Sequence, residues 1–358
     1  MIWMLDGYKN LSKEYVINSK SPFISIIVAA KNEESNIANL LNDLKKQSYP
    51  SDKYEVIVCN DNSVDNTNKI VDYFKNDFPN LHLINIKNTP DNWAGKKWAL
   101  YQGIKKAKGE IILQTDADCI VGFEWISAIS SQFIDDSVGF VCGLTPLYNK
   151  DNDSFYNKIL LFDSIAQDAF IACAIGKGIT LSATGRNIAY RKNYFFQANG
   201  YDEISNIISG DDDLLLHKIV YYVHCKVKFI VHKNASVYSS PPMTFNKFIN
   251  QRLRFASKGF IYYQKNFISN ELKVILPFLY LVNLSVTATL LAFCYNASFL
   301  YLLPFFLKII PELLYVYSFK NHFNLRNDLF VIIFTTVIHP FYIIFFGLLG
   351  PIYNFKWK

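Results

Sequence analysis

The chain has 358 residues, which suits one large domain or two small ones, and 51% of them are hydrophobic. This apolar content is high for a soluble domain, and the excess lies in the last quarter of the sequence. The net charge of +6 is modest, and no dense lysine and arginine run with interleaved aromatics occurs, so nucleic acid is not an expected partner.

Residues 1–22 are mixed and polar. They have no long apolar core behind a basic start, so we expect an N-terminal extension rather than a signal peptide, and a cytoplasmic location for the domain that follows. The six cysteines show no CxxC spacing. They are typical of small apolar core residues in a reducing compartment, and indicate neither a zinc site nor a disulfide framework.

The first 240 residues alternate strand-like and helix-like segments. Continuous apolar strands separated by helices predict an α/β domain with a mainly parallel sheet, helices on both faces, and ligands beyond the carboxyl ends of the strands. The pattern predicts strands at 23–30, 54–59, 81–86, 110–115 and 138–144, and helices at 33–47, 65–78, 94–107 and 153–174.

Asp116 and Asp118 stand one residue apart where the strand at 110–115 meets a loop. Carboxylate oxygens are hard ligands suited to Mg²⁺ or Mn²⁺, and an ion held there would neutralise a diphosphate. A DxD by itself is more often a pair of solvated turn residues. The position at a strand end and the other acidic clusters favour the metal site here, with Asp118 as the more direct ligand.

Polar residues also follow the first two strands. Lys31-Asn32-Glu33 comes after the strand at 23–30, and Asp61 ends the strand at 54–59. Asp61 either belongs to a helix-capping turn or accepts a hydrogen bond from a nucleobase N–H. Lys96 opens the helix at 94–107, where free N–H groups and lysines face either phosphate or solvent.

Asp211, Asp212 and Asp213 precede an apolar helix, although one carboxylate would suffice as an N-cap. Adjacent carboxylates repel each other, and that cost indicates a site in which one of them acts as a general base. Gln251 and Arg254 lie one turn apart on a basic helix. That helix either clamps a diphosphate or rests on lipid headgroups.

The sequence contains no charged residue between Val274 and Leu307, a run long enough to cross a bilayer. We expect spans at 274–295 and 329–350. The segment at 299–317 contains Lys308, Pro311 and Glu312, and is either a poor third span or an interfacial or re-entrant helix.

Taken together, the motifs resemble the family-2 glycosyltransferases that have a GT-A fold and C-terminal membrane helices. The resemblance covers roughly residues 23–350. The family's opening motif is matched by Ala30, Asn32 and Glu33; its second motif by Asp61; its metal-binding DxD by Asp116 and Asp118; its GxNxAYR segment by Gly185 and Asn187; its Glu-Asp pair by Asp211 and Asp212; and its QxxRW motif by Gln251, Arg254 and Phe255.

The resemblance implies roles for the residues that match. Asp212 would be the catalytic base, and Ala30, Asn32, Glu33, Asp61 and Asp116 would bind the donor nucleotide, which Lys96 would also face from the start of its helix. Gly185, Asn187, Asp211, Gln251, Arg254 and Phe255 would contact the diphosphate or the acceptor, with Mg²⁺ or Mn²⁺ on Asp116 and Asp118. Three positions depart from the family pattern: Asn60 for aspartate, Asp211 for glutamate and Phe255 for tryptophan.

The implied protein is an inverting hexosyl- or N-acetylhexosaminyl-transferase. It would use a nucleotide-diphosphate sugar, UDP-linked by preference, and a lipid or glycan acceptor at the cytoplasmic face of the cell membrane. We expect a GT-A domain at 23–240, juxtamembrane amphipathic helices at 241–272 and membrane helices within 273–352. The alternatives are a processive polysaccharide synthase, a nucleotidyltransferase, and a non-catalytic membrane scaffold that keeps the fold.

Overall fold

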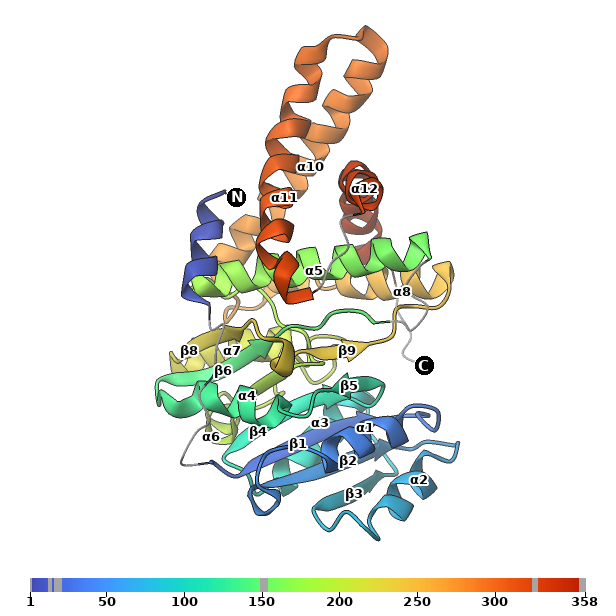
Figure 1. Cartoon of the computed structure of the whole chain (residues 1–358), viewed down its shortest axis with the longest axis vertical. Coiled ribbons are helices and arrows are strands. Elements are labelled where there is room, and N and C mark those ends of the chain that lie inside the picture. Colours follow the sequence, from blue (N-terminus) through green and yellow to red (C-terminus); the bar gives the residue numbers. More distant parts are fainter. Residues whose placement is uncertain (1, 12–14, 16–20, 149–153, 324–327, 354–358) are drawn as a thin grey trace. The chain divides into compact units, whose positions relative to one another are not determined.

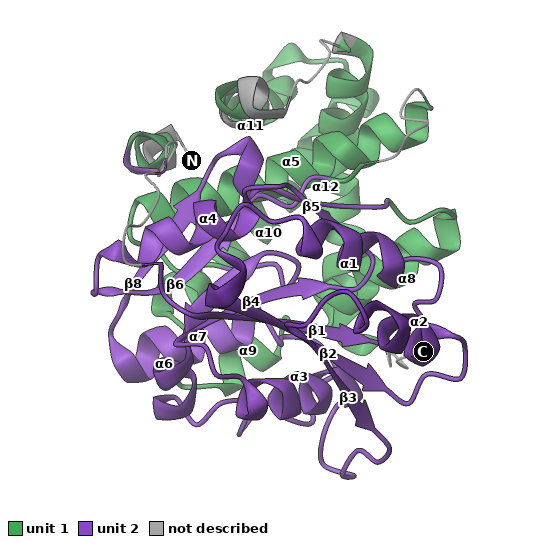
Figure 2. Cartoon of the chain, turned by 60° about the horizontal axis from the view of Figure 1, so that its bottom comes forward, with its two compact units in different colours: residues 1–9, 147–181, 241–358 green, residues 10–146, 182–240 purple. Residues whose placement is uncertain are grey.

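The computed structural model (Figure 1) describes residues 2–11, 15, 21–148, 154–323 and 328–353. The chain forms two compact units (Figure 2). We call residues 10–146 and 182–240 the α/β unit, and residues 1–9, 147–181 and 241–358 the helical unit. The expected boundaries after residues 22, 240 and 272 stay predictions. The helical unit also takes in residues 147–181, which come from the middle of the sequence.

The α/β unit is built on a seven-stranded sheet in the order β3-β2-β1-β4-β7-β6-β8. β7 runs antiparallel to both of its neighbours, and the other pairs in the sheet are parallel. Two further short strands pair antiparallel in a second sheet. The strands are β1 Ile24–Ala30, β2 Tyr54–Asp61, β3 Leu81–Ile86, β4 Ile111–Asp116, β5 Cys119–Val121, β6 Val138–Gly143, β7 Ile188–Arg191, β8 Lys226–Ile230 and β9 Val237–Ser239.

Helices connect these strands. A right-handed crossover from β1 to β2 and from β2 to β3 places α1 and α2 on one face, and the return from β3 to β4 places α3 on the other. The helices are α1 Ile37–Lys45, α2 Thr67–Phe74, α3 Gly95–Lys106, α4 Trp125–Ser130, α6 Lys192–Gln197 and α7 Asp213–Val223, with 3-10 turns at Ser51–Lys53, Ser131–Ile134 and Lys233–Ala235.

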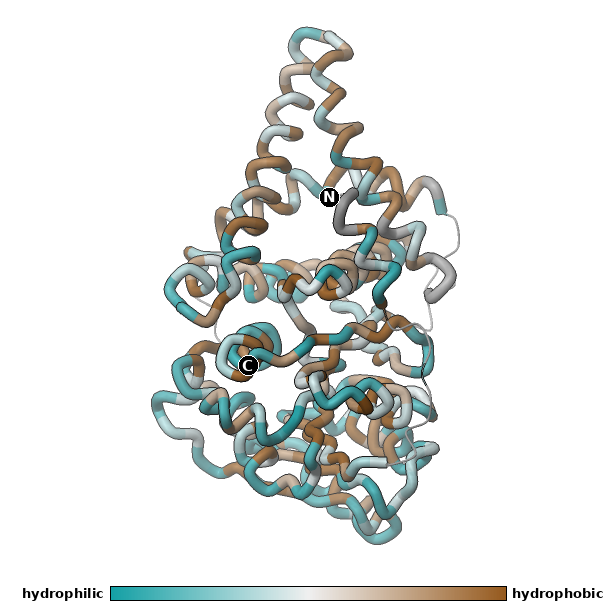
Figure 3. Tube along the Cα trace, turned by 90° about the vertical axis from the view of Figure 1, so that its left-hand side faces the viewer, coloured by the Kyte–Doolittle hydropathy of each residue, from teal (hydrophilic) through white to brown (hydrophobic). Residues whose placement is uncertain are grey.

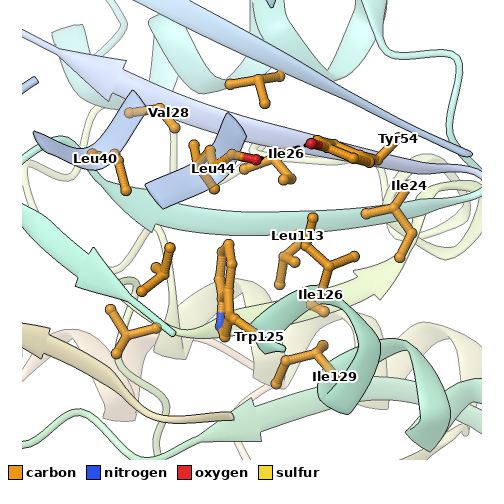
Figure 4. Packing of buried hydrophobic residues seen from close by; sticks show 14 of the residues in the cluster. Ile24, Ile26, Val28, Leu40, Leu44, Tyr54, Leu113, Trp125, Ile126 and Ile129 are labelled. Atoms are coloured by element: carbon orange, nitrogen blue, oxygen red, sulfur yellow. Dashed lines mark hydrogen bonds between the residues drawn. The ribbon is translucent and has the colours of Figure 1, made fainter. Parts of the chain in front are cut away.

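The core of the α/β unit forms because its strands are apolar on both faces. Residues of β1 and β4 pack against α1 and α4 (Figure 4), and the Trp125 side chain is fully buried among Leu113, Ile126 and their neighbours. A buried polar anchor lies in this core: the Trp125 indole N–H donates to Asn187 Oδ1 at 3.0 Å. Such packing holds the ends of the central strands in fixed positions.

The helical unit contains a hairpin of two long apolar helices, α10 and α11, which lie side by side (Figure 1) and are largely hydrophobic (Figure 3). α5 packs against α11 and α12. The elements are α5 Phe155–Gly176, α8 Phe245–Ala256, α9 Ile261–Gln264, α10 Asn270–Asn296, α11 Leu303–Phe323 and α12 Leu329–Leu349, with 3-10 helices at Ile2–Asn10, Phe299–Leu302 and Gly350–Ile352.

Four helices in the described part of the chain are long and apolar enough to cross a membrane: Phe155–Gly176, Asn270–Asn296, Phe299–Phe319 and Phe330–Ile352. Three of them match the expected spans. The fourth, α5, was expected as a helix of the GT-A domain. In its most apolar stretch 56% of the residues are buried, against 11% for α10, so protein rather than lipid covers much of this helix.

The segment expected at 299–317 as a poor span or an interfacial helix is a continuous helix across Pro311. Its two charges neutralise each other, because Lys308 Nζ lies 2.8 Å from Glu312. The first residues of the expected N-terminal extension form a 3-10 helix. This helix packs so closely on α5 that a Cβ at Gly7 would clash with the Cys173 carbonyl oxygen.

The predicted α/β class is confirmed, with strand and helix ranges close to those expected as far as β6. The pattern of the second half did not predict β7, which enters antiparallel between β4 and β6. It is only four residues long, and its register is set by both neighbours rather than by its own sequence. The three strands β5, β8 and β9 are also short or half exposed and were not predicted.

Candidate active site

The predicted donor-binding residues lie at the carboxyl edge of β2, β1 and β4, which are neighbours in that order. Ala30 pairs with Asn60, and Ala29 pairs with Asp116, so the three strands end at the same level. The chain leaves β1 toward β2 on one side and returns to β4 on the other. Such a reversal opens a crevice at the strand ends, where α/β proteins bind ligands.

The loops after β1 and β2 are joined by hydrogen bonds. The Asn32 N–H donates to Ser63 Oγ at 3.0 Å, and the Val64 N–H donates to Asn32 Oδ1 at 2.9 Å. The Glu33 N–H donates to Thr67 Oγ1 at 2.8 Å. Asn32 adopts a φ of 56°, in the left-handed region that asparagine tolerates better than most residues. Asn32 therefore shapes the loop pair through its own backbone and side chain.

Asp61 is nearly buried at the end of β2. Lys31 Nζ lies 3.7 Å from its Oδ2. The first residue of α3, Gly95, lies so close that an added Cβ would be 2.7 Å from the same oxygen. Glycine at this position lets the N-terminus of α3 approach the carboxylate, which places Asp61 between a lysine and the positive end of a helix.

Lys96 links acids from the two halves of the α/β unit. Its ammonium lies 2.8 Å from Asp116 Oδ1 and 2.9 Å from Asp211 Oδ2. Burial would lower the pKa of Lys96, but the two carboxylates outweigh it and raise the pKa above its usual range. Burial likewise would raise the pKa of Asp211, yet the Lys96 ammonium holds that pKa below its ordinary value. Lys96 and Asp211 are therefore both charged at neutral pH.

The pKa of Asp118, the second aspartate of the DxD, is shifted in the opposite direction from that of Asp211. Burial and the neighbouring Asp116 carboxylate raise the pKa of Asp118 above its ordinary value, although Arg186 and Lys96 oppose the shift. Burial also raises the pKa of Glu33, with a further contribution from Asp118 and Asp116. The three carboxyl groups thus lie close enough to repel one another, and a cation among them would relieve that repulsion.

The donor set at Asp116 and Asp118 fits a hard divalent cation. Within the described residues, no three His, Cys, Asp or Glu side chains converge to hold a metal by protein ligands alone. Mg²⁺ is commonly bound by one or two carboxylates, with substrate phosphates and water supplying the other ligands. The two adjacent carboxylates at the end of β4 support a cation here, because the pKa of Asp118 stays raised although Arg186 and Lys96 offset part of the negative charge.

The three consecutive acids before α7 have different partners. Asp211 faces Lys96, and it also accepts a 3.4 Å hydrogen bond from Gln114 Nε2. Asp212 is the N-cap of α7: its Oδ1 accepts from the Asp213 N–H and its Oδ2 from the Gly185 N–H, both at 2.8 Å. Asp213 is buried and accepts from the Leu214 N–H. Of the three, Asp212 is the more exposed and is oriented by two backbone donors.

The segment from Gly185 to Asn187 divides into two roles. Gly185 contacts the predicted base through its N–H. Asn187 is buried, and its Nδ2 donates to the carbonyls of Leu144 and Ala235 at 2.9 and 2.7 Å while its Oδ1 accepts from the Trp125 indole. The Asn187 amide thus joins the residue after β6, the 3-10 turn at Lys233–Ala235 and α4, and we infer that it positions these elements.

Two residues of this region were not singled out from the sequence. Lys97 is fully buried, and its ammonium donates to the carbonyls of Ile204, Ile207 and Ser209 at 2.7–2.8 Å, which fixes the loop leading to Asp211. Arg186 lies near enough to Asp118 to lower its pKa, and it donates to Thr145 Oγ1 at 3.2 Å. The sequence feature that could have identified them is their position inside the motifs around Lys96 and Gly185.

Gln251, Arg254 and Phe255 belong to the helical unit, on α8, and their role in the site stays a prediction. The arginine between them, Arg252, is buried and paired with Asp163. Arg254 is only half-buried and lies over the Phe255 ring at 5.3 Å. α8 therefore uses Arg252 within its own unit and presents Arg254 on a more open face.

Residues 25–196, somewhat less than half of the chain, match the family model described as Glycosyl transferase family 2. The chain is 36% identical over 125 residues to a beta-monoglucosyldiacylglycerol synthase from Nostoc sp., covering 35% of this chain and 26% of that protein. It is 33% identical over 200 residues to the glycosyltransferase AglE of Haloferax volcanii, covering 55% and 60% respectively. The chain thus spans less than two thirds of these relatives' own lengths.

The structure is similar to that of a mannosyltransferase from Pyrobaculum calidifontis, solved in complex with GDP-Man and Mn²⁺. The TM-score is 0.59 at 16% sequence identity, over 98% of this chain and 90% of the other. At that identity the likeness shows a shared GT-A-like fold. The matched family segment contains the DxD and Gly185, whereas Asp211, Asp212 and the Gln251–Phe255 motif lie beyond it.

Proposed function

Because this chain carries a glycosyltransferase family 2 domain, we propose that it transfers a sugar from a nucleotide-diphosphate donor to an acceptor hydroxyl at a membrane surface. The observation that carries the proposal is the acidic cluster around Lys96 at the ends of β1, β2 and β4. Excess negative charge at that edge suits a cation together with a diphosphate. The donor is UDP-linked by preference, and the transfer inverts the anomeric centre.

The donor nucleoside is proposed to lie between the loops after β1 and β2. There the Asp61 carboxylate accepts a hydrogen bond from the base, beside Ala30, Asn32 and Glu33. Lys96 and the N-terminus of α3 face the phosphates. Mg²⁺ or Mn²⁺ on Asp116 and Asp118 would offset the negative charge that develops on the leaving diphosphate.

The acceptor is proposed to be activated by Asp212. Its carboxylate takes the proton of the acceptor hydroxyl as the oxygen attacks the anomeric carbon, and the bond to the nucleoside diphosphate breaks on the opposite side. The backbone donors at Gly185 and Asp213 hold Asp212 in one orientation, which reduces the cost of reaching the reactive geometry. Asp211 keeps Lys96 beside the leaving group.

Gln251 and Arg254 are proposed to contact the diphosphate and to exclude water, which would otherwise hydrolyse the donor. Phe255 stands where related enzymes have tryptophan and would contact the acceptor. The helices α10, α11 and α12 would anchor the protein in the cell membrane with its α/β unit in the cytoplasm. α5 crosses the base of the α10–α11 hairpin (Figure 1), which suits an interfacial position better than a span.

The proposal is tested by incubating the purified full chain with UDP-glucose, UDP-N-acetylglucosamine and GDP-mannose, with Mn²⁺, Mg²⁺ or EDTA. We expect metal-dependent release of the nucleoside diphosphate from at least one donor, accelerated by a membrane lipid extract that becomes glycosylated. Products with many sugars would favour a processive synthase. Absence of release from every donor, with the metal present and the protein folded, would contradict the enzymatic proposal and favour a scaffold.

A further inference from the structure

The helical unit contains a cavity of about 230 Å³ that lies wholly within this unit. Its walls come from α5, α10, α11 and α12. Most of the wall is apolar, formed by side chains such as Phe162, Phe170, Leu279, Val282 and Ile343. A cavity of this kind, between helices that are apolar enough to meet a membrane, suits a hydrocarbon chain.

The charged groups of the cavity cancel one another. Lys308 is the only lysine or arginine among the described residues that line it, and two carboxylates, Glu312 and Asp163, line it as well. The Asp163 carboxylate is paired with Arg252 from outside the cavity. The Lys308 ammonium lies 2.8 Å from the Glu312 carboxylate and 3.3 Å from His339 Nδ1. Because the lysine is already neutralised, an anionic headgroup would bring an uncompensated charge into the cavity, and that is costly in an apolar environment.

The wall of the cavity contains a buried hydrogen-bond acceptor without a donor. Asn283 is 4% exposed; its Nδ2 donates to the Leu279 carbonyl at 2.7 Å, while its Oδ1 accepts no hydrogen bond from any described residue. The hydroxyl protons of Thr335 and Thr336 are also used, in bonds to the carbonyls of Val331 and Ile332. A buried acceptor without a donor is rare and costly, so these oxygens call for a ligand that donates.

We propose that this cavity binds a neutral lipid that carries a free hydroxyl. The hydrocarbon chain lies along the apolar walls, and the hydroxyl donates to Asn283 Oδ1. A lipid phosphate carries at least one negative charge at neutral pH and meets no unpaired cation among the lining residues. The site goes beyond the proposed sugar transfer, because binding here requires neither the donor sugar nor the acids of the α/β unit.

The test measures displacement of a fluorescent diacylglycerol from the purified full chain in detergent, without donor sugar. The competitors are dioleoylglycerol, its 3-O-methyl ether, which cannot donate, and dioleoyl phosphatidic acid, which has the same chains. We expect dioleoylglycerol to compete about five- to tenfold better than the ether, since one buried hydrogen bond distinguishes them, and phosphatidic acid to compete least. Equal competition by all three, or preference for phosphatidic acid, would overturn the proposal.

Three variants locate the binding. Asn283→Leu should weaken dioleoylglycerol about five- to tenfold and leave the ether unchanged. Ala166→Phe should abolish binding, because Ala166 lines the cavity and the larger phenylalanine side chain would occupy the space of the lipid. Thr287→Val is the matched control: it also removes an unpartnered buried oxygen on α10, but outside the cavity, and should bind normally. Normal binding by both cavity variants, with unchanged melting temperatures, would place the lipid elsewhere and overturn the proposal.

Donor hydrolysis measured on the same preparations keeps the two proposals apart. If the lipids compete in the expected order while no donor is hydrolysed, the cavity assignment holds and the proposed transferase activity fails. If donors are hydrolysed but the lipids show no preference for a hydroxyl, the cavity assignment fails and the transferase proposal stands.

Discussion

Each unit of the protein contains a buried lysine beside carboxylates, but the charge balance differs. In the α/β unit, Lys96 lies between Asp116 and Asp211, and the Asp118 carboxylate lies close enough to Asp116 for the two to repel each other. In the helical unit, Lys308 meets the single carboxylate of Glu312. The first cluster keeps an excess of negative charge, which a cation can neutralise; the second is balanced and suits an uncharged ligand. The charge left over after pairing therefore distinguishes the two sites.

The largest expected effect tests which carboxylate of the first cluster does chemistry. Asp212→Asn should lower kcat for sugar transfer by about a thousandfold, since asparagine cannot take the acceptor proton. Asparagine keeps one oxygen for the backbone donors but loses the second acceptor, so the melting temperature should fall slightly while donor affinity persists. Steady-state kinetics and donor titration provide the measurement. The exposed Asp136→Asn serves as control, and near-normal turnover by Asp212→Asn would remove Asp212 from the role of base.

A third buried lysine, Lys97, has carbonyl rather than carboxylate partners. Lys97→Met should lower the free energy of unfolding by about 3 kcal/mol, because three buried carbonyls lose their donor. Thermal melting followed by tryptophan fluorescence is suitable, since Trp93, Trp98 and Trp125 lie in the α/β unit. Lys105→Met, at an exposed position on the same helix, should change stability little. Equal melting of both variants would contradict the structural role of Lys97.

Removal of the metal tests whether a cation neutralises the excess negative charge at Asp116 and Asp118. EDTA should weaken donor binding by roughly thirtyfold, about 2 kcal/mol, and Mn²⁺ should restore it. Asp118→Asn should bind donor as weakly as the EDTA-treated protein and respond to neither reagent. Isothermal titration with the nucleoside diphosphate measures both effects. A variant that keeps the full response to Mn²⁺ would show that Asp118 is not a ligand.

The smallest effect concerns the two arginines of α8. Arg254→Met should lower transfer by about tenfold at unchanged melting temperature, if Arg254 contacts the diphosphate. Arg252→Met should instead lower the melting temperature, because it leaves the buried Asp163 carboxylate without its partner. Kinetics and thermal melting of the pair check this difference. Loss of stability in both variants, with equal activity, would assign both arginines to the packing of α8.

The sequence alone determined the features that depend on local pattern. Apolar runs of strand length between helical stripes predicted β1 to β4 and hence the edge at which Asp61, Asp116 and Asp118 lie. The length of the uncharged run after Val274 predicted the apolar helices. These features follow from the period of the apolar residues and the length of the apolar runs. Both are properties of residues that are neighbours in the sequence.

Only the tertiary structure decided which polar residues meet. Lys96 and Asp211 are far apart in the sequence, and β7 acquires its antiparallel place from the two strands beside it. Asn187 has the same side chain whether it binds a ligand or anchors a core, and only the folded chain shows its three buried hydrogen-bond partners. A polar group's role depends on what surrounds it after folding, and that is set by long-range packing rather than by local pattern.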